Sequence, residues 1–412
     1  MVEVPSLDQS TPGASKEWAG KRAAVKEFVE QVVYPAEKQM AAQGADRKQV
    51  MKGLMQQAKD AGLWALGHPT EIGGQGMPFM DYVYVNEVVG RSELAMGALG
   101  THSLQDSIML HLYADEEWKA RYLEPLVAGE VFPSFAMTEP NIASSDPTQI
   151  ETKAELDGNH WVINGHKWFI TGAMNAAYTT IMCRTDPDAP RHEQFTMIVV
   201  PTDAEGYEIV RDVKVMGEYH DHCELKFNNL RVPTANTLGE RGQAFKIAQM
   251  RLGPGRIFHC MRWLGQAQRA FDLMCNRLNN RVAFGERLAD KQLMQLHVFE
   301  SAAQIQASRL LTLDAARKMD SGSDARIEIA LIKVVGARMV HDVIDRAIQV
   351  HGAMGVTEDT PLEGMYRAAR FARIYDGPDE VHIQSTARRI LREYDKGRGW
   401  DFGERDLMAY EG

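Results

Sequence analysis

The 412-residue sequence contains few cysteines, and they lie far apart along the chain. The four positions are Cys183, Cys223, Cys260 and Cys275, and no two of them form a C-x-x-C pair. The pattern therefore gives no support for a disulfide framework or a zinc knuckle. It favours reduced thiols and a cytoplasmic location.

Long apolar segments and an excess of basic charge are also lacking. The longest apolar runs, such as 198–200, are far too short to cross a bilayer, so membrane insertion is not expected. The first 16 residues are mostly polar and contain no apolar core, which predicts no signal peptide. The formal net charge of -10 gives no support for a nucleic-acid partner.

The hydrophobic pattern divides the chain into three blocks. Apolar residues recur at helical spacing in residues 1–130, as they do again in 241–412. The marker positions of these helices are Val25, Phe28, Val29 and Val32; Leu54, Met55, Ala58 and Leu63; Tyr82, Val83, Val85, Val88 and Val89; 106–113; and Ile332, Val335, Met339, Val343 and Ala347.

Between these helical blocks, residues 131–240 show a period of two, which is typical of strands. Cys223, Leu225 and Phe227 alternate with polar residues, and 196–200 is a short strand candidate. Asp157-Gly158 and Asn164-Gly165 are both expected to form turns. The block is predicted to be a compact antiparallel β domain. No G-x-G-x-x-G motif follows a strand, so a Rossmann-type nucleotide site is not expected. The fold class is therefore α+β, in the order helical, β, helical.

Two segments of the β block contain candidate ligand-binding residues. The first runs from T-E-P at 138–140 to S-S-D at 144–146, and the second is N-G-H-K-W-F-I-T-G-A at 164–173. Taken alone, each reads as an ordinary polar loop or a strand with core aromatics. As a pair they also fit a hydroxyl-rich loop and an aromatic wall beside a flavin ring.

The pair resembles the acyl-CoA dehydrogenase family, which has a T-E-P loop followed by an I-N-G-x-K-x-[WF]-I-T strand. The resemblance extends through the C-terminal block in three further motifs. These are R-V-A-F-G at 281–285, Q-V-H-G-A-M-G at 349–355, and Y-D-G at 375–377, where the family has Y-E-G. It implies an N-terminal helical domain (1–130), a central antiparallel β domain (131–240) and a C-terminal four-helix bundle (241–412). The stretch 377–382 resembles a branch that includes a vertebrate mitochondrial or peroxisomal group acting on long and hydroxylated acyl chains.

The resemblance implies FAD as the cofactor and a homodimer or homotetramer, since part of the FAD contacts comes from a neighbouring subunit. The implied FAD contacts are Met137, Thr138, Ser145, Phe169 and Thr171, and across the subunit boundary Arg281, Phe284, Gln292, Gln349, Gly352 and Ala353. The implied substrate contacts are Ser144, Arg256, Tyr375 and Gly377. No metal is expected, because His220 and His222 share a strand face without a convincing third ligand.

The implied reaction is the α,β-dehydrogenation of a fatty acyl-CoA to the trans-2-enoyl-CoA, a step of β-oxidation. Asp376 would remove the α-proton and the flavin would take the β-hydride. An electron-transferring flavoprotein would then accept the electrons. Asp376 is one methylene shorter than the usual Glu, while Gly255 stands where some relatives place the base. Arg256 is expected either to hold the CoA or to order the loop. Pro378 and His382 depart from the usual pattern, which puts the adenosine contacts in doubt.

Three other functions remain open on the sequence. Nitroalkane oxidase resembles this family and uses an aspartate base, and acyl-CoA oxidase shares the family's chemistry with O2 as acceptor. A DNA-binding member of the fold is disfavoured, because residues 395–412 carry mixed charge instead of a basic excess. The acyl chain could be long, branched, aromatic or 4-hydroxylated.

Overall fold

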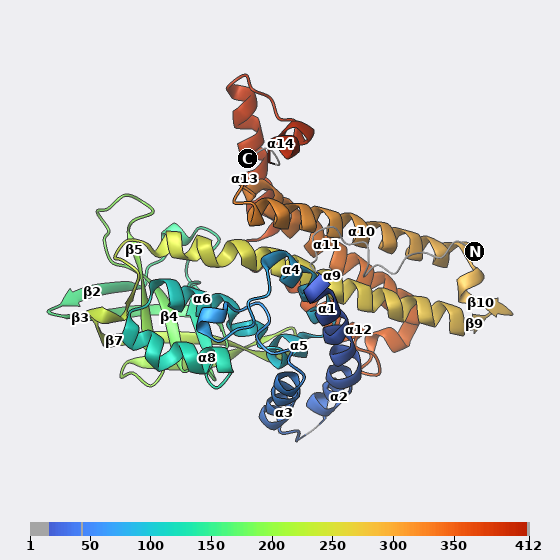
Figure 1. Cartoon of the computed structure of the whole chain (residues 1–412), viewed down its shortest axis with the longest axis horizontal. Coiled ribbons are helices and arrows are strands. Elements are labelled where there is room, and N and C mark those ends of the chain that lie inside the picture. The colour runs from blue at the N-terminus through green and yellow to red at the C-terminus, as the bar shows by residue number, and fades with distance from the viewer. Residues whose placement is uncertain (1–15, 43, 410–412) are drawn as a thin grey trace. The chain divides into compact units, whose positions relative to one another are not determined.

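The computed structural model describes residues 16–42 and 44–409 of the chain. The expected absence of a signal peptide concerns the first 16 residues and so falls almost entirely outside the described part. The described chain forms two compact units (Figure 1). The helical unit comprises the residues up to Trp64, Met77–Leu99 and the chain from Gly253 onward, and the sheet unit comprises Ala65–Gly76 and Gly100–Leu252. The predicted domain boundaries at 130/131 and 240/241 stay a prediction.

The helical unit joins short N-terminal helices to long C-terminal ones. The N-terminal set is α1 (Lys16–Phe28), α2 (Tyr34–Ala41), α3 (Arg47–Asp60), α4 (Phe79–Val89) and α5 (Glu93–Ala98). The apolar spacing is confirmed in α1 and α3, except that Val33 is buried where Val32 was expected. Helix α4 is buried on all sides from Asp81 to Val89, not along one stripe. Its Glu87 carboxylate accepts from Arg309 of α10 at 2.6 Å, which ties α4 to the long helices.

The C-terminal helices form the predicted bundle, in which α11 packs against α10, α12 and α13 (Figure 1). The helices are α9 (Ala244–Asn280), α10 (Gln292–Asp320), α11 (Arg326–His351), α12 (Leu362–Phe371), α13 (Asp379–Asp395) and α14 (Phe402–Ala409). The expected face of α11 is confirmed at four of its five positions, while Val335 is 36% exposed. A two-stranded hairpin of β9 (Val282–Ala283) and β10 (Glu286–Arg287) connects α9 to α10.

The sheet unit contains one eight-stranded sheet with the strand order β6-β7-β3-β2-β4-β5-β8, while β1 pairs with β4. The strands are β1 (Pro133–Ala136), β2 (Lys153–Asp157), β3 (His160–Thr171), β4 (Tyr178–Arg184), β5 (Phe195–Pro201), β6 (Tyr207–Val215), β7 (Glu218–Pro233) and β8 (Thr237–Leu238). Pairing is antiparallel except where β1 and β2 meet β4. Helices α6 (Leu104–Tyr113), α7 (Glu116–Trp118) and α8 (Glu124–Ala128) belong to the same unit.

One of the two predicted turns is wrong. Asp157 ends β2 and His160 begins β3, so a two-residue hairpin turn occurs there as expected. Asn164-Gly165 instead lies inside β3, where the register with β7 shifts between Ile163 and Gly165. Glycine is needed for close packing, since a Cβ at 165 would lie 2.3 Å from Thr152 Oγ1. The turn-like dipeptide thus marks a bulged pairing within the sheet.

No helix within residues 16–42 and 44–409 combines the length and the apolar character needed to span a bilayer.

Candidate functional site

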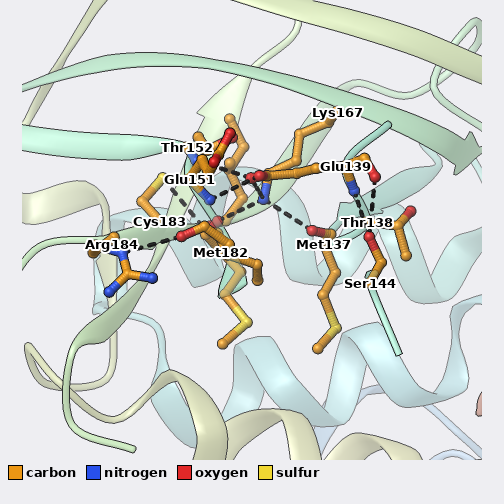
Figure 2. Close-up of polar contacts among 12 residues, drawn as sticks. Met137, Thr138, Glu139, Ser144, Glu151, Thr152, Lys167, Met182, Cys183 and Arg184 are labelled. Carbon is orange, nitrogen blue, oxygen red and sulfur yellow. Dashed lines mark hydrogen bonds and ion pairs between the residues drawn. The ribbon is translucent and has the colours of Figure 1, made fainter. Parts of the chain in front are cut away.

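Loop 137–146 of the sheet unit is fastened to β3 by a buried ion pair (Figure 2). Lys167 is fully buried, and its Nζ donates to Glu139 Oε1 and to the backbone carbonyls of Met137 and Met182, each at 2.9 Å. An ammonium group has three donors, so all three are used. The Glu139 carboxylate also accepts the backbone N–H groups of Glu151 at 2.7 Å and Thr152 at 2.9 Å.

Burial alone would favour the neutral acid at Glu139, yet the charged form prevails. Lys167 and the N–H donors of Glu151 and Thr152 outweigh the desolvation, and they hold the pKa of Glu139 below its usual range. The pair therefore fixes the loop on the sheet as a charged, fully hydrogen-bonded unit. Glu139 belongs to the T-E-P motif and Lys167 to the β3 motif, so the contact joins the two segments.

The predicted loop residues lie beside β3, and several of their polar groups bond locally. Thr138 Oγ1 donates to the Trp168 carbonyl at 2.5 Å, and the Trp168 N–H donates back to the Thr138 carbonyl at 3.1 Å. Ser144 Oγ accepts the Glu139 N–H at 2.9 Å and donates to the Glu139 carbonyl at 3.1 Å. Ser145 is exposed. The substrate role of Ser144 stays a prediction, because its hydroxyl already orders the loop.

A bulge in β3 turns Phe169 outward. The register places Lys167 opposite Leu225 and Ile170 opposite Cys223, so two residues of β3 face one residue of β7. A bulge of this kind re-aims the side chain that follows it. Phe169 has φ +55° and is 42% exposed, although strand alternation would have buried it. Thr171 ends the strand.

These residues fit a flavin. A phenylalanine kept in a left-handed backbone conformation and turned to the outside contributes little to a core, and an exposed aromatic face of this kind suits a flat ligand ring. Thr171 Oγ1 lies 2.9 Å from His222 Nδ1, and a hydroxyl can both donate and accept. Met137, Thr138 and Phe169 would face the ring and Ser145 the pyrophosphate, while Thr171 would approach the flavin nitrogen edge.

The predicted cross-subunit contacts lie at two places in the helical unit. Arg281 precedes β9, Phe284 lies in the turn between β9 and β10, and Gln292 begins α10. Phe284 has φ +56° and is 99% exposed. Gln349 lies in the last turn of α11, and Gly352 and Ala353 follow it. Gly352 has φ +65°, and no atom lies within 4 Å of the Cβ position, so the backbone there is open to a ligand. Their contact with a neighbour's FAD stays a prediction.

The turn that carries Asp376 is strained and held from three helices. Asp376 has φ +55° and Gly377 has φ +97°, a rare conformation for a non-glycine residue. The Asp376 carbonyl accepts from Arg256 Nε of α9 and from His382 Nε2 of α13, each at 3.1 Å. Lys333 of α11 is fully buried and donates to the Gly377 carbonyl at 3.1 Å. Backbone strain supported in this way is characteristic of functional residues.

The Asp376 carboxylate points to a histidine that the sequence did not single out. His259 Nε2 lies 3.1 Å from Asp376 Oδ2, and the two side chains are 28% and 25% exposed. Beside them, Trp263 Nε1 donates to the Tyr375 hydroxyl at 2.9 Å. The Arg256 contact agrees with the loop-ordering role, while its CoA role stays a prediction. The structure thus brings Arg256, Tyr375, Asp376 and Gly377 together within one unit.

Sequence reasoning did not single out His259 and Lys333, although both contact the Asp376 turn. A signal for the histidine was present, because Arg256, His259 and Trp263 recur at i, i+3 and i+7 and so share one face of α9. Lys333 had no such signal. A single lysine in an apolar helix face reads as a surface position unless its acceptors are known.

Comparisons with known proteins agree with this arrangement. The chain matches three family models: "Acyl-CoA dehydrogenase, N-terminal domain" at residues 16–130, "middle domain" at 134–230 and "C-terminal domain" at 242–391. It is 46% identical to "Probable acyl-CoA dehydrogenase FadE2" of Mycobacterium tuberculosis over 351 residues, which cover 83% of this chain and 86% of that protein.

Two further proteins are similar to this chain, and they differ in how much of their own length is matched. The chain is 40% identical to "Acyl-CoA dehydrogenase family member 11" of Mus musculus over 390 residues, covering 90% of this chain but only 50% of that relative. The chain therefore spans about half the length of that protein. Its structure is similar to that of a putative acyl-CoA dehydrogenase from Mycobacterium abscessus, with a TM-score of 0.88, 35% identity, and coverage of 92% of this chain and 99% of that one.

Proposed function

Because the chain belongs to the acyl-CoA dehydrogenase family, we propose that it converts a fatty acyl-CoA to the trans-2-enoyl-CoA with Asp376 as the base. The class of enzyme follows from the family, and FAD is the cofactor. The base, the acyl chain and the electron acceptor are the proposal. The observation that carries it is the strained Asp376 turn, whose carboxylate remains partly exposed.

The chemistry requires a base for a weak carbon acid. The α-hydrogen of a thioester leaves as a proton when a carboxylate faces it at hydrogen-bonding distance. Asp376 would take that proton on a carboxylate oxygen. Its backbone N–H would support the negative charge that develops on the thioester oxygen. Bound FAD supplies a two-electron acceptor for the hydride that leaves the β-carbon.

The surrounding residues would hold this base in position. Arg256, His382 and Lys333 fix the backbone on either side of the Asp376 side chain. Each of them donates to a backbone carbonyl of this turn, so together they set the position from which the carboxylate projects. A rigid turn is valuable here, since a catalytic group misplaced by about 1 Å loses much of its effect.

The test is anaerobic bleaching of the yellow FAD protein. We expect one of butanoyl-, octanoyl- or hexadecanoyl-CoA to bleach the wild-type flavin. Asp376→Asn should keep the colour and slow bleaching by about 10²- to 10⁴-fold. If the Asn variant bleaches at the wild-type rate, Asp376 is not the base.

The same preparation separates the competing oxidases. Rapid O2 consumption and peroxide release with an acyl-CoA would identify an acyl-CoA oxidase, and nitrite release from a nitroalkane would identify a nitroalkane oxidase. Slow reaction with O2, together with fast reoxidation by an electron-transferring flavoprotein, is the expected result. Light scattering after gel filtration tests the predicted homodimer or homotetramer. The cytoplasmic location stays a prediction from the cysteine pattern.

A further inference from the structure

We propose that His259 is a positioning residue for the base: as a neutral imidazole it donates its Nε2–H to Asp376, which orients the carboxylate and stabilises its charged form. The proposal rests on the proposed role of Asp376, and it deepens that role by naming a partner for the side chain itself. All the residues involved belong to the helical unit.

The tautomer of His259 follows from its second contact. Arg262 Nη2 lies 3.0 Å from His259 Nδ1. A guanidinium has only donors, so Nδ1 must accept and cannot carry a proton. The proton of the neutral ring is therefore on Nε2, the nitrogen that lies 3.1 Å from Asp376 Oδ2. Arg262 is itself buried and donates to Asn86 Oδ1 at 3.2 Å, so its orientation is fixed from α4.

The surroundings keep the ring neutral and in place. Burial lowers the pKa of His259, and the nearby positive charges of Arg262 and Lys333 act in the same direction against the weaker pull of Asp376. Ring contacts with Trp263, at 6.1 Å between centroids, and with Tyr375, at 5.1 Å, restrict its rotation. Asp376 therefore accepts a hydrogen bond from an uncharged imidazole, and His259 adds no positive charge beside the carboxylate.

The hydrogen bond has two consequences for the reaction. It holds one carboxylate oxygen, so the plane of the acid is set before the substrate arrives. It also favours the ionised acid over the protonated one. In the step itself a C–H bond at the α-carbon breaks, its proton passes to an Asp376 oxygen, and its electron pair stays on the substrate. His259 keeps its own proton throughout.

The groups around Asp376 come from every helix packed on it. Helix α9 contributes His259, Arg256, Arg262 and the Cys260 thiol; α11 contributes Lys333; α13 contributes His382; and Tyr375 is adjacent in the chain. Burial lowers the pKa of His382 to about 4 and raises that of Cys260 to about 12. Both groups are neutral between pH 5 and 9, and the Leu and Gln variants both lack the His259 titration, so a difference between their acid limbs reports the carboxylate.

The test compares His259→Leu with His259→Gln in the FAD-loaded protein. The anaerobic bleaching rate is measured from pH 5 to 9 with the fastest of butanoyl-, octanoyl- and hexadecanoyl-CoA. A hydrogen bond to a charged group is strong enough that its loss in the Leu variant should move the acid limb to higher pH by about 1 to 2 pH units. The Gln amide retains a donor, so its acid limb should stay within about 0.5 pH unit of wild type.

His341→Leu is the matched control. His341 Nδ1 lies 3.7 Å from the Asp342 carboxylate, and its side chain is 24% exposed, close to the 28% of His259. The acid limb of the His341→Leu variant should be the same as that of wild type. A purely structural role for His259 would lower the rate of both of its variants equally at every pH, and that result would overturn the proposal.

Two readouts keep this proposal distinct from the proposed function. Histidine ¹⁵N NMR of the holoprotein, assigned by the signal lost in His259→Gln, should show a neutral ring protonated at Nε2 at pH 7. A ring protonated at Nδ1, or at both nitrogens, would overturn the proposal whether or not any thioester bleaches the flavin. If Asp376→Asn bleaches normally, both proposals fail. If it does not bleach but the His259 variants keep the wild-type acid limb, only the positioning role fails.

Discussion

Each unit of the molecule contains a carboxylate that contacts a nitrogen group of a side chain, and the two pairs differ in burial and in their hydrogen-bond partners. In the sheet unit, Glu139 and Lys167 are 4% and 0% exposed, and all three ammonium donors are engaged (Figure 2). In the helical unit, Asp376 and His259 are 25% and 28% exposed. The first pair is closed off from solvent, whereas the second pair is partly exposed to it.

The difference lies in where the hydrogen-bond donors are directed. Around Glu139 they converge on the carboxylate itself, which stays ionised and unreactive. Around Asp376, Arg256 and His382 donate to the backbone carbonyl, and Lys333 donates to the next one. The side chain is thus positioned through its backbone, with His259 as a contact of its own. These contacts fix the backbone on both sides of the proposed base.

Lys167→Met should produce the largest stability change. It leaves the Glu139 carboxylate buried without its cation, and breaking a buried pair on one side costs about 3 to 5 kcal/mol of unfolding free energy. We also expect loop 137–146 to loosen, so FAD retention should fall. Urea unfolding and the flavin absorbance after gel filtration measure the two effects.

Lys153→Met is the matched control, because it removes the same charge from the same sheet. Lys153 pairs with Glu155 at 3.1 Å, but the two side chains are 54% and 64% exposed. Exposed pairs contribute about 0 to 1 kcal/mol. If both variants lose the same unfolding free energy, the buried pair stabilises the protein no more than the exposed pair does. The structural role that distinguishes the Glu139 pair from the Asp376 pair would then be wrong.

Gly377→Ala tests the strained turn and should have a smaller effect. Gly377 has φ +97°, and a Cβ there would lie 2.7 Å from His382 Nε2, so both strain and contact oppose the substitution. A loss of about 1 to 3 kcal/mol is expected from the backbone strain. The bleaching rate should fall as well, because His382 must move away from the Asp376 carbonyl.

The helical Gly364→Ala provides the comparison for that substitution. Gly364 is exposed in α12, and no atom lies within 4 Å of its Cβ position. Alanine favours a helix over glycine, so no loss of stability is expected. If Gly377→Ala is equally harmless in both stability and bleaching rate, the turn is not under the constraint inferred from its backbone.

The regular elements and the family motifs could be predicted from the sequence because their signals are local. The period of two in β7 marked its buried face, and the apolar spacing of α11 marked a core helix. Asn164-Gly165 failed because a turn dipeptide and a bulged strand share the same composition. The choice between them is made by Thr152, which is close in space but not in the local pattern.

The site could be predicted only as far as its motifs extend. Asp376 and its neighbours Tyr375 and Gly377 belong to one motif and were found together. His259 and Lys333 reach that turn from other helices, more than 40 residues away along the chain, and no motif includes them. Their role depends on tertiary packing, which sequence periodicity does not report. Lys167 and Glu139 lay inside motifs, yet their pairing became visible only in the structure.

A pH dependence shared by both units should be the smallest effect. Burial lowers the pKa of His68 in the sheet unit and of His382 in the helical unit to about 4. The unfolded chain binds a proton on each near pH 6.5, so unfolding takes up protons between pH 6.5 and 4, and stability falls as the pH drops through that window. Each histidine should account for about 1 to 2 kcal/mol between pH 7 and pH 5.

Replacing either histidine by glutamine removes its titration, so the loss of stability between pH 7 and pH 5 should shrink in His68→Gln and in His382→Gln. Urea midpoints at the two pH values give this difference. Only His382→Gln should also slow anaerobic bleaching, because His382 donates to the Asp376 carbonyl, whereas His68 contacts Ser103 Oγ at 3.0 Å. Slowed bleaching in both variants, or in neither, would contradict the specific role given to the His382 contact with the Asp376 carbonyl.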